Sequence, residues 1–399
     1  MRAPTLIIPV LSFCLCGVAM AAEALDIGDQ NQVFIDGRFL QEAEGVKLKV
    51  CPPKKTGERC WRGKTGAYSQ IMEPDGVFRG FYALTKDGAN WRRARHGDLP
   101  EEDDILGVRY GGDTVFVDPK APPESRYKLF SGMRNRISGS SDGTKWEILH
   151  EGVFPAKARY PFGMDSQNVC FYDARLGKYT AYVRKNNIYT CPEDMVWYYK
   201  LLGKERYGAE NRYARRTIAR AVSETLSEFP MPELVMEPDG RDPMFKGCRV
   251  MDFYCPQVLS YPYAQDAYFL FNCRYFSYED WYLPIDMSGF NRGTLRDPAD
   301  GKRKPIGTYN AGVEDIELDA SRDGIHWNRY ARRPWIHQGE EGAADSLTMY
   351  MTRGMYLHGD EIWMYYVGLD DPHTGRPEAQ DRYTLTRVVL RKDGFTCVE

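Results

Sequence analysis

The sequence lacks most of the short motifs that assign a chain to an enzyme class. It contains no glycine-rich phosphate-binding loop and no Gly-x-Ser-x-Gly elbow. No cysteine or histidine spacing resembles a zinc site. These gaps argue against P-loop nucleotide chemistry, α/β-type serine hydrolysis and structural zinc, and no motif calls for a cofactor.

Excess positive charge and long hydrophobic runs are also missing from most of the chain. The formal net charge is −3, which gives no attraction to nucleic acid or to an anionic membrane surface. The long apolar run lies in residues 1–22, where Arg2 precedes it and small residues follow it. This pattern predicts a signal peptide, a secreted or periplasmic protein without membrane attachment after cleavage, and one domain over residues 23–399. It leaves the oligomeric state open.

Cysteine is present in an even number, ten in all, of which two lie in the predicted signal. An even number in an exported chain permits disulfides. Cys51 with Cys60, and Cys248 with Cys255, are close enough in sequence to pair. The alternative is that several of these cysteines are free, buried thiols.

The sequence is rich in aromatic residues and in one repeated turn. Asp-Gly followed by Trp occurs in "TKDGANW" (85–91), "SSDGTKW" (140–146) and "SRDGIHW" (321–327), with weaker copies at 223–229 and 391–395. Asp-Gly favours tight reversals between strands, and short aromatic and β-branched strands precede each copy. The pattern predicts an all-β fold, a five-bladed β-propeller of four-stranded antiparallel blades. Each Trp would pack between blades.

Two insertions interrupt the predicted blades. Residues 185–216 have a partly helical pattern, and residues 275–313 resemble an irregular aromatic loop. Both fall between the second and third strands of a blade, so both should project from the same face and shape a binding site. The segment around Asp36 resembles a lead-in strand that completes the last blade.

An aspartate stands at the start of the inner strand in four predicted blades: Asp113, Asp165, Asp252 and Asp345. The first blade has Tyr68 and Ser69 there instead. Crowded carboxyl groups cannot all ionise freely, so one residue type can supply both an acid and a base, as glycosidic bond cleavage requires. The alternative is that each Asp caps its strand through backbone hydrogen bonds.

Catalysis is assigned to Asp165 and Asp345, with Glu341 as the general acid and Glu314 as its alternative. Asp113 and Asp252 would orient sugar hydroxyls or tune a pKa. A solvated loop charge is the competing interpretation for either glutamate.

Further substrate contacts are predicted for five residues. Gln167, Asn168 and Arg184 offer hydrogen bonds or an ion pair, and Tyr254 and Trp281 offer stacking surfaces. Packing within the propeller is the alternative for the aromatic residues. His337 could stand near an axial calcium ion, but no motif supports a metal there.

The segments "DSQNVCFYDARLGKYTAYVRK", "DIELDASRDGIHW" and "GDEIWMYYVG" resemble the five-bladed propeller glycosidases, which include arabinanases, invertases and levansucrases. The closest resemblance is to a secreted branch that is similar to the N-terminal domain of the invertase family, over residues 30–399. It implies a first-blade Asp as base or nucleophile, a second Asp that tunes, and a Glu as acid. This chain lacks that first-blade Asp and the "WMNDPNG" motif.

The sequence therefore predicts a secreted glycoside hydrolase that acts on a poly- or oligosaccharide through carboxyl groups. A propeller that binds carbohydrate without cleaving it is the alternative. The sugar and the linkage are not specified by the sequence.

Overall fold

The structure is a computed structural model that describes residues 26–29, 31–39, 44–63, 70–72, 78–80, 83–85, 87, 89, 92–93, 113–143, 145–159, 164, 167–190, 212–242, 251–277, 294–296, 303–305, 312–330, 332–371, 373 and 383–399. Its regular structure is nearly all β, with two 3-10 turns, η1 (Pro123–Ser125) and η2 (Ala156–Arg159). Within these residues no helix has the length and hydropathy that a bilayer span requires.

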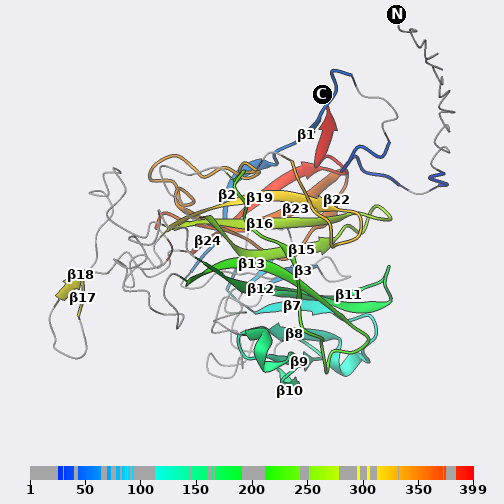
Figure 1. Cartoon of the computed structure of the whole chain (residues 1–399), viewed down its shortest axis with the longest axis vertical. Helices are drawn as coiled ribbons and strands as arrows, with labels where there is room; N and C mark the ends of the chain where they lie inside the picture. The colour runs from blue at the N-terminus through cyan, green and yellow to red at the C-terminus, as the bar shows by residue number, and fades with distance from the viewer. Residues whose placement is uncertain are drawn as a thin grey trace, which may run out of the picture.

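The strands form antiparallel sheets that succeed one another along the chain (Figure 1). The first contains β3 (Gln70–Met72), β4 (Phe78–Gly80), β5 (Ala83–Thr85) and β6 (Arg92–Arg93). The second contains β7 (Thr114–Val117), β8 (Tyr127–Ser131), β9 (Arg136–Ser140) and β10 (Glu147–Glu151). The third contains β11 (Val169–Asp173), β12 (Lys178–Thr190), β13 (Arg212–Ser223) and β14 (Glu233–Met236).

The fourth sheet contains β15 (Met251–Ser260), β16 (Tyr268–Ser277), β19 (Gly312–Ser321) and β20 (Asn328–Arg329). The last runs in the order β21 (Thr348–Met351), β23 (Glu361–Leu369), β24 (Tyr383–Arg391) and β2 (Lys54–Gly63), and β22 (Tyr356–His358) pairs with β23. The first strands of the sheets contact one another in the order β3, β7, β11, β15 and β21. This propeller-like arrangement confirms the all-β fold class, while the number of blades around an axis stays a prediction.

The last sheet is completed from the other end of the chain. Strand β2 pairs with β24, so a strand near the N-terminus joins strands near the C-terminus. The lead-in strand predicted around Asp36 is wrong, because residues 31–39 contain no strand. The Asp36 carboxylate instead accepts a hydrogen bond of 2.9 Å from Arg322 Nε, and the neighbouring Val33 and Ile35 are buried in the core.

The Asp-Gly turns have the same geometry in two sheets. The amide of Gly143 donates to Ser140 Oγ at 2.9 Å, and the amide of Gly324 donates to Ser321 Oγ at the same distance. Both glycines have positive φ values, 76° and 72°, which side chains with a Cβ rarely adopt. The serine and the glycine of the motif therefore fix the turn together.

The tryptophan of the fourth-sheet copy packs across a boundary between sheets, as predicted. Trp327 meets the ring of Tyr182 from β12 edge to face, with the ring centroids 6.0 Å apart. Tyr182 also donates a hydrogen bond of 2.7 Å to the carbonyl oxygen of Gly324. The repeated turn thus attaches one sheet to the preceding one.

Both insertions connect the second and third strands of their sheets, as predicted. In the first, β12 continues to residue 190 and β13 begins at residue 212, so the sheet extends into it. The predicted helical stretch falls in residues 191–211, outside the described residues. The second contains a hairpin of β17 (Thr294–Arg296) and β18 (Arg303–Pro305) where the sequence predicted an irregular loop.

The described cysteines are all free thiols, so the structure does not contain the Cys51–Cys60 bridge. Cys60 is buried, and the Sγ atom of Cys51 lies 3.2 Å from that of Cys397. The suggested partner of Cys255, Cys248, lies outside the described residues.

Candidate active site

Three of the four strand-head aspartates lie in the described part of the chain, and each faces a different basic side chain. Asp252 accepts from Arg216 Nη1 at 2.8 Å. Asp345 lies 2.5 Å from Lys55 Nζ. Asp113 is buried, and burial raises its pKa to about 7 against the opposing charges of the nearby Arg134 and Arg136. The fourth, at position 165, lies outside the described residues.

Asp252 shares a row of the fourth sheet with a second carboxyl group. Asp252 on β15 is paired with Tyr275 on β16, and Tyr275 is paired with Glu314 on β19. Directly paired residues in antiparallel strands project from the same face. All three side chains therefore lie on one face, at the end of the sheet from which the 277–312 connection leaves.

Glu314 is fully buried, and its surroundings are mostly uncharged. Its Oε2 atom lies 3.4 Å from the thiol of Cys273, and its Oε1 atom lies 3.4 Å from His373 Nδ1. Burial raises the pKa of Glu314 to about 8, although contacts with Cys273 and Tyr350 and the charge of Arg216 act in the opposite direction. At neutral pH the fold therefore holds this carboxyl group as an acid.

Aromatic rings surround the two carboxyl groups. The guanidinium of Arg216 lies 5.3 Å from the ring centroid of Tyr254 and 4.9 Å from that of Tyr275. The imidazole of His373 lies edge-on to both rings, at 4.8 and 5.3 Å, and its Nδ1 is 2.8 Å from the hydroxyl of Tyr350. Together these residues form the Asp252–Glu314 cluster, which comprises Arg216, Asp252, Tyr254, Tyr275, Glu314, Tyr350 and His373.

The predicted substrate contacts fall into two groups. Tyr254 belongs to the cluster, and Arg184 lies beside it, with its guanidinium 5.7 Å from the Tyr254 ring. Asn168 instead braces the backbone, because its Oδ1 accepts from the amide of Arg184 at 2.8 Å and its Nδ2 donates to the carbonyl of Met164. Gln167 accepts a hydrogen bond of 2.6 Å from Gln257 Nε2 and is likewise buried.

The other predicted catalytic residues lie elsewhere. The carboxylate of Asp345 accepts from Tyr366 Oη at 2.6 Å in addition to Lys55, so its Oδ2 atom is already engaged within the last sheet. Glu341 is exposed in the loop before β21, as is His337. Trp281 lies outside the described residues. Among the described side chains no group of three or more His, Cys, Asp or Glu has metal-binding geometry.

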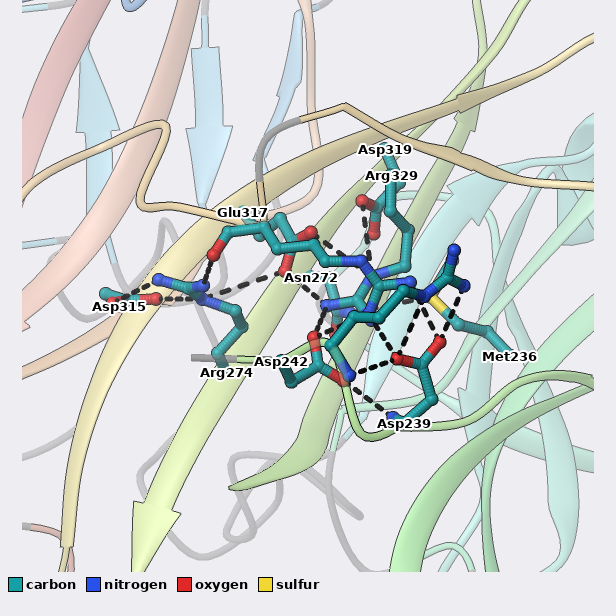
Figure 2. A network of polar contacts seen from close by, with 11 residues as sticks. Met236, Asp239, Asp242, Asn272, Arg274, Asp315, Glu317, Asp319 and Arg329 are labelled. Atoms are coloured by element: carbon teal, nitrogen blue, oxygen red, sulfur yellow. Dashed lines mark hydrogen bonds and ion pairs between the residues drawn. The ribbon is translucent and has the colours of Figure 1, made fainter. Parts of the chain in front are cut away.

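The opposite face of β19 carries a separate network of buried charges (Figure 2). Asp315 receives two hydrogen bonds of 2.7 Å from Arg274, and Glu317 lies 2.8 Å from Arg329 Nη2. Arg329 also contacts Asp242 at 2.5 Å, which ties the loop after β14 to the fourth sheet. Arg274 and Arg329 form ion pairs with acidic groups of that face. Glu314 projects from the other face of β19, so the strand separates it from both arginines.

Sequence reasoning missed Arg216, Tyr275, Cys273 and His373 as parts of the site. Arg216 sits at the end of a predicted insertion, and His373 follows the "GLDDP" stretch with no motif around it. The available signal was the alternation in "VEDIELDAS", which places Glu314 on one face of the strand and the next three acidic residues on the other.

No family model matches the chain, and no curated protein matches it. Among solved structures, a thermostable family-43 glycoside hydrolase is similar at 12% identity over 86% of this chain and 95% of its own, with a TM-score of 0.46. An α-L-arabinofuranosidase from Podospora anserina in complex with cellotriose is similar at 13% identity over 86% and 95%, with a TM-score of 0.43. A β-1,2-mannobiose phosphorylase from Listeria innocua is similar at 12% over 81% and 74%, with a TM-score of 0.44. At these identities and TM-scores the similar structures assign neither a substrate nor a catalytic residue to this chain.

Proposed function

We propose that the chain is an exported glycoside hydrolase whose reaction takes place at the Asp252–Glu314 cluster. The observation that carries this proposal is that two carboxyl groups in different environments, Asp252 and Glu314, lie in one row on one face of the fourth sheet. Glu314 is buried and retains its proton at neutral pH, whereas Asp252 forms an ion pair with Arg216. Two carboxyl groups in contrasting environments can divide the roles of acid and base.

The spacing of the two groups suits a sugar between them. One strand separates β15 from β19, so the two backbones are roughly 10 Å apart, twice the spacing of neighbouring strands. Both side chains project from the same face, and carboxyl pairs that cleave glycosidic bonds are roughly 5–9.5 Å apart. Tyr254 is partly exposed and offers a ring on which a pyranose or furanose can stack, and the buried Tyr275 packs against it.

In the proposed reaction Glu314 donates its proton to the glycosidic oxygen as the bond to the anomeric carbon breaks. The Asp252 carboxylate acts on the opposite side of the sugar, either on the anomeric carbon or on the water that attacks it. Arg216 orients that carboxylate through the contact of 2.8 Å. His373 and Tyr350 orient the Glu314 carboxyl group from the adjacent sheet.

The test is release of sugar from a panel of aryl glycosides and of plant and algal polysaccharides. The purified chain should release product, and Glu314→Gln and Asp252→Asn should each lose at least roughly 100-fold in kcat while the circular dichroism spectrum is unchanged. Glu341→Gln is the matched control, because it makes the same change at an exposed loop position. Loss of activity in the control but not in Glu314→Gln would contradict the assignment.

A carbohydrate-binding propeller without catalysis is the second candidate. It is favoured by the engagement of Asp345 with Lys55 and Tyr366, which leaves one predicted catalytic carboxylate in a structural role. Calorimetry with the same polysaccharides distinguishes the two. Binding without turnover, retained in Glu314→Gln, would support this candidate and overturn the hydrolase.

A further inference from the structure

Two strands from near opposite ends of the chain meet in a small sheet of their own. Strand β1 (Leu48–Val50) pairs with β25 (Thr396–Val398), with Lys49 opposite Cys397. The pairing continues one residue further, because the amide of Cys51 donates to the carbonyl of Phe395 at 2.9 Å. Cys51 and Cys397 are therefore diagonal neighbours on the same face of an antiparallel pair.

The thiols of these two residues are close enough to react with each other. Their Sγ atoms lie 3.2 Å apart, and a disulfide bond is about 2.05 Å long. Small side-chain rotations that shorten the Sγ–Sγ distance by roughly 1 Å would therefore bring the two atoms to bonding distance. Cys397 is exposed and Cys51 is half-buried, whereas the other described cysteines are buried. A dissolved oxidant can therefore reach this pair and not the others.

We propose that Cys51 and Cys397 form a redox-active pair that closes to a disulfide when the protein meets a disulfide oxidant, such as glutathione disulfide or the disulfide form of a thiol oxidoreductase. The exposed Cys397 thiolate attacks the oxidant's sulfur and displaces one thiol, which gives a mixed disulfide. Cys51 then attacks Cys397 Sγ and displaces the second thiol. The protein loses two protons and two electrons, and the oxidant gains them as two thiols.

Burial and neighbouring charges set the order in which the two thiols react. Burial raises the pKa of Cys51 to about 11, and the adjacent Cys397 adds to that rise, while the positive charges of Lys49 and Arg391 oppose it. Cys51 therefore attacks slowly on its own, and the exposed Cys397 begins the exchange. Since Cys51 is the second nucleophile, the mixed disulfide at Cys397 should accumulate before the bridge forms.

The bridge would fasten the strand that completes the last sheet. Strand β1 leads into β2, and β24 leads into β25, while β2 and β24 are paired with each other. A bond between Cys51 and Cys397 thus holds together the two strands that join the beginning of the chain to its end. A two-stranded sheet has little stability by itself, so the covalent link should matter here.

The experiment compares the parent with Cys51→Ser and Cys397→Ser in glutathione disulfide and in dithiothreitol. The oxidised parent should lose two titratable thiols, show a linked peptide containing residues 51 and 397, and melt roughly 5 °C higher than the reduced parent. Each serine variant should melt at the same temperature in both buffers.

The proposal is overturned if the oxidised parent keeps both thiols open to alkylation without denaturant, or if Cys51 is found linked to Cys60. Trapping with iodoacetamide at short times gives a second readout that does not depend on stability. Glutathione should be found on Cys397 in Cys51→Ser. Glutathione on Cys51 alone would contradict the proposed order of attack.

Discussion

At the residue scale, Glu314 carries a carboxyl group that the fold removes completely from solvent. Burial favours the protonated form of this carboxyl group more strongly than the charge of Arg216 opposes it, and the protonated form is the state that a general acid needs. Burial raises the pKa of Glu314 to about 8. We expect kcat on a glycoside substrate to fall as the pH rises through about 8. A profile of kcat between pH 5 and pH 10 checks this, and a decline already complete at pH 6 would contradict it.

The same shift makes a prediction about stability. Between pH 4.5 and about 8 the folded chain keeps a proton on Glu314 that the unfolded chain has lost. The folded state therefore binds more protons in this window, and this residue lowers the free energy of unfolding as the pH rises, by roughly 5 kcal/mol in total. Guanidinium titrations at pH 5 and pH 9 measure the free energy of unfolding of both proteins. It should fall less between these pH values in Glu314→Gln than in the parent. An equal pH dependence in both proteins would refute it.

The sequence could identify some of these residues and not others, for physical reasons. Asp252 and Tyr254 begin an inner strand, where the repeat pattern places them without a structure. Arg216 lies on β13 in a stretch that the sequence assigned to an insertion, and His373 lies in the connection between β23 and β24, so only the fold brings them beside the carboxyl groups. Asp345 matches the repeat equally well, yet Lys55 from the distant β2 engages it.

At the scale of the element, the repeated Asp-Gly turn is predicted correctly because its requirements are local. A serine that accepts from a glycine amide, and a glycine with positive φ, are fixed by four adjacent residues. Strand β2 is different, since its pairing with β24 joins residues far apart in sequence and no local pattern selects it over the segment around Asp36.

The turn can be tested by adding a methyl group to Gly324. A Cβ there would approach Tyr182 Oη to 2.4 Å, in addition to the strain of a φ of 72°. Gly342→Ala is the matched control, because its φ is 82° and a Cβ would meet nothing within 4 Å. We expect Gly324→Ala to lower the free energy of unfolding by roughly 1–3 kcal/mol more than the control does. Equal losses of unfolding free energy in urea titrations would show that the close approach of the added Cβ to Tyr182 has no cost.

At the scale of the whole molecule, the N-terminal segment is held to the fourth sheet by Arg322. Its guanidinium contacts Asp36 at 2.9 Å, Asp266 at 3.0 Å and the carbonyl of Val33 at 2.7 Å. We expect Arg322→Met to lower the free energy of unfolding by roughly 1–3 kcal/mol and to speed proteolytic cleavage near residue 36. Arg241→Met, at an exposed ion pair, should change stability by less than about 0.5 kcal/mol. Unchanged cleavage in Arg322→Met would mean that the segment is held by other contacts.

The measurement that tests the central claim most directly is the dependence of cleavage on the leaving group. The dinitrophenolate leaving group departs from a glycoside without protonation, whereas nitrophenyl and alkyl leaving groups need a proton from an acid. The account predicts that Glu314→Gln keeps most of its activity on a dinitrophenyl glycoside and loses at least roughly 100-fold on the others. Equal losses on all substrates, or no loss on any, would contradict the assignment of Glu314 as the acid of this site.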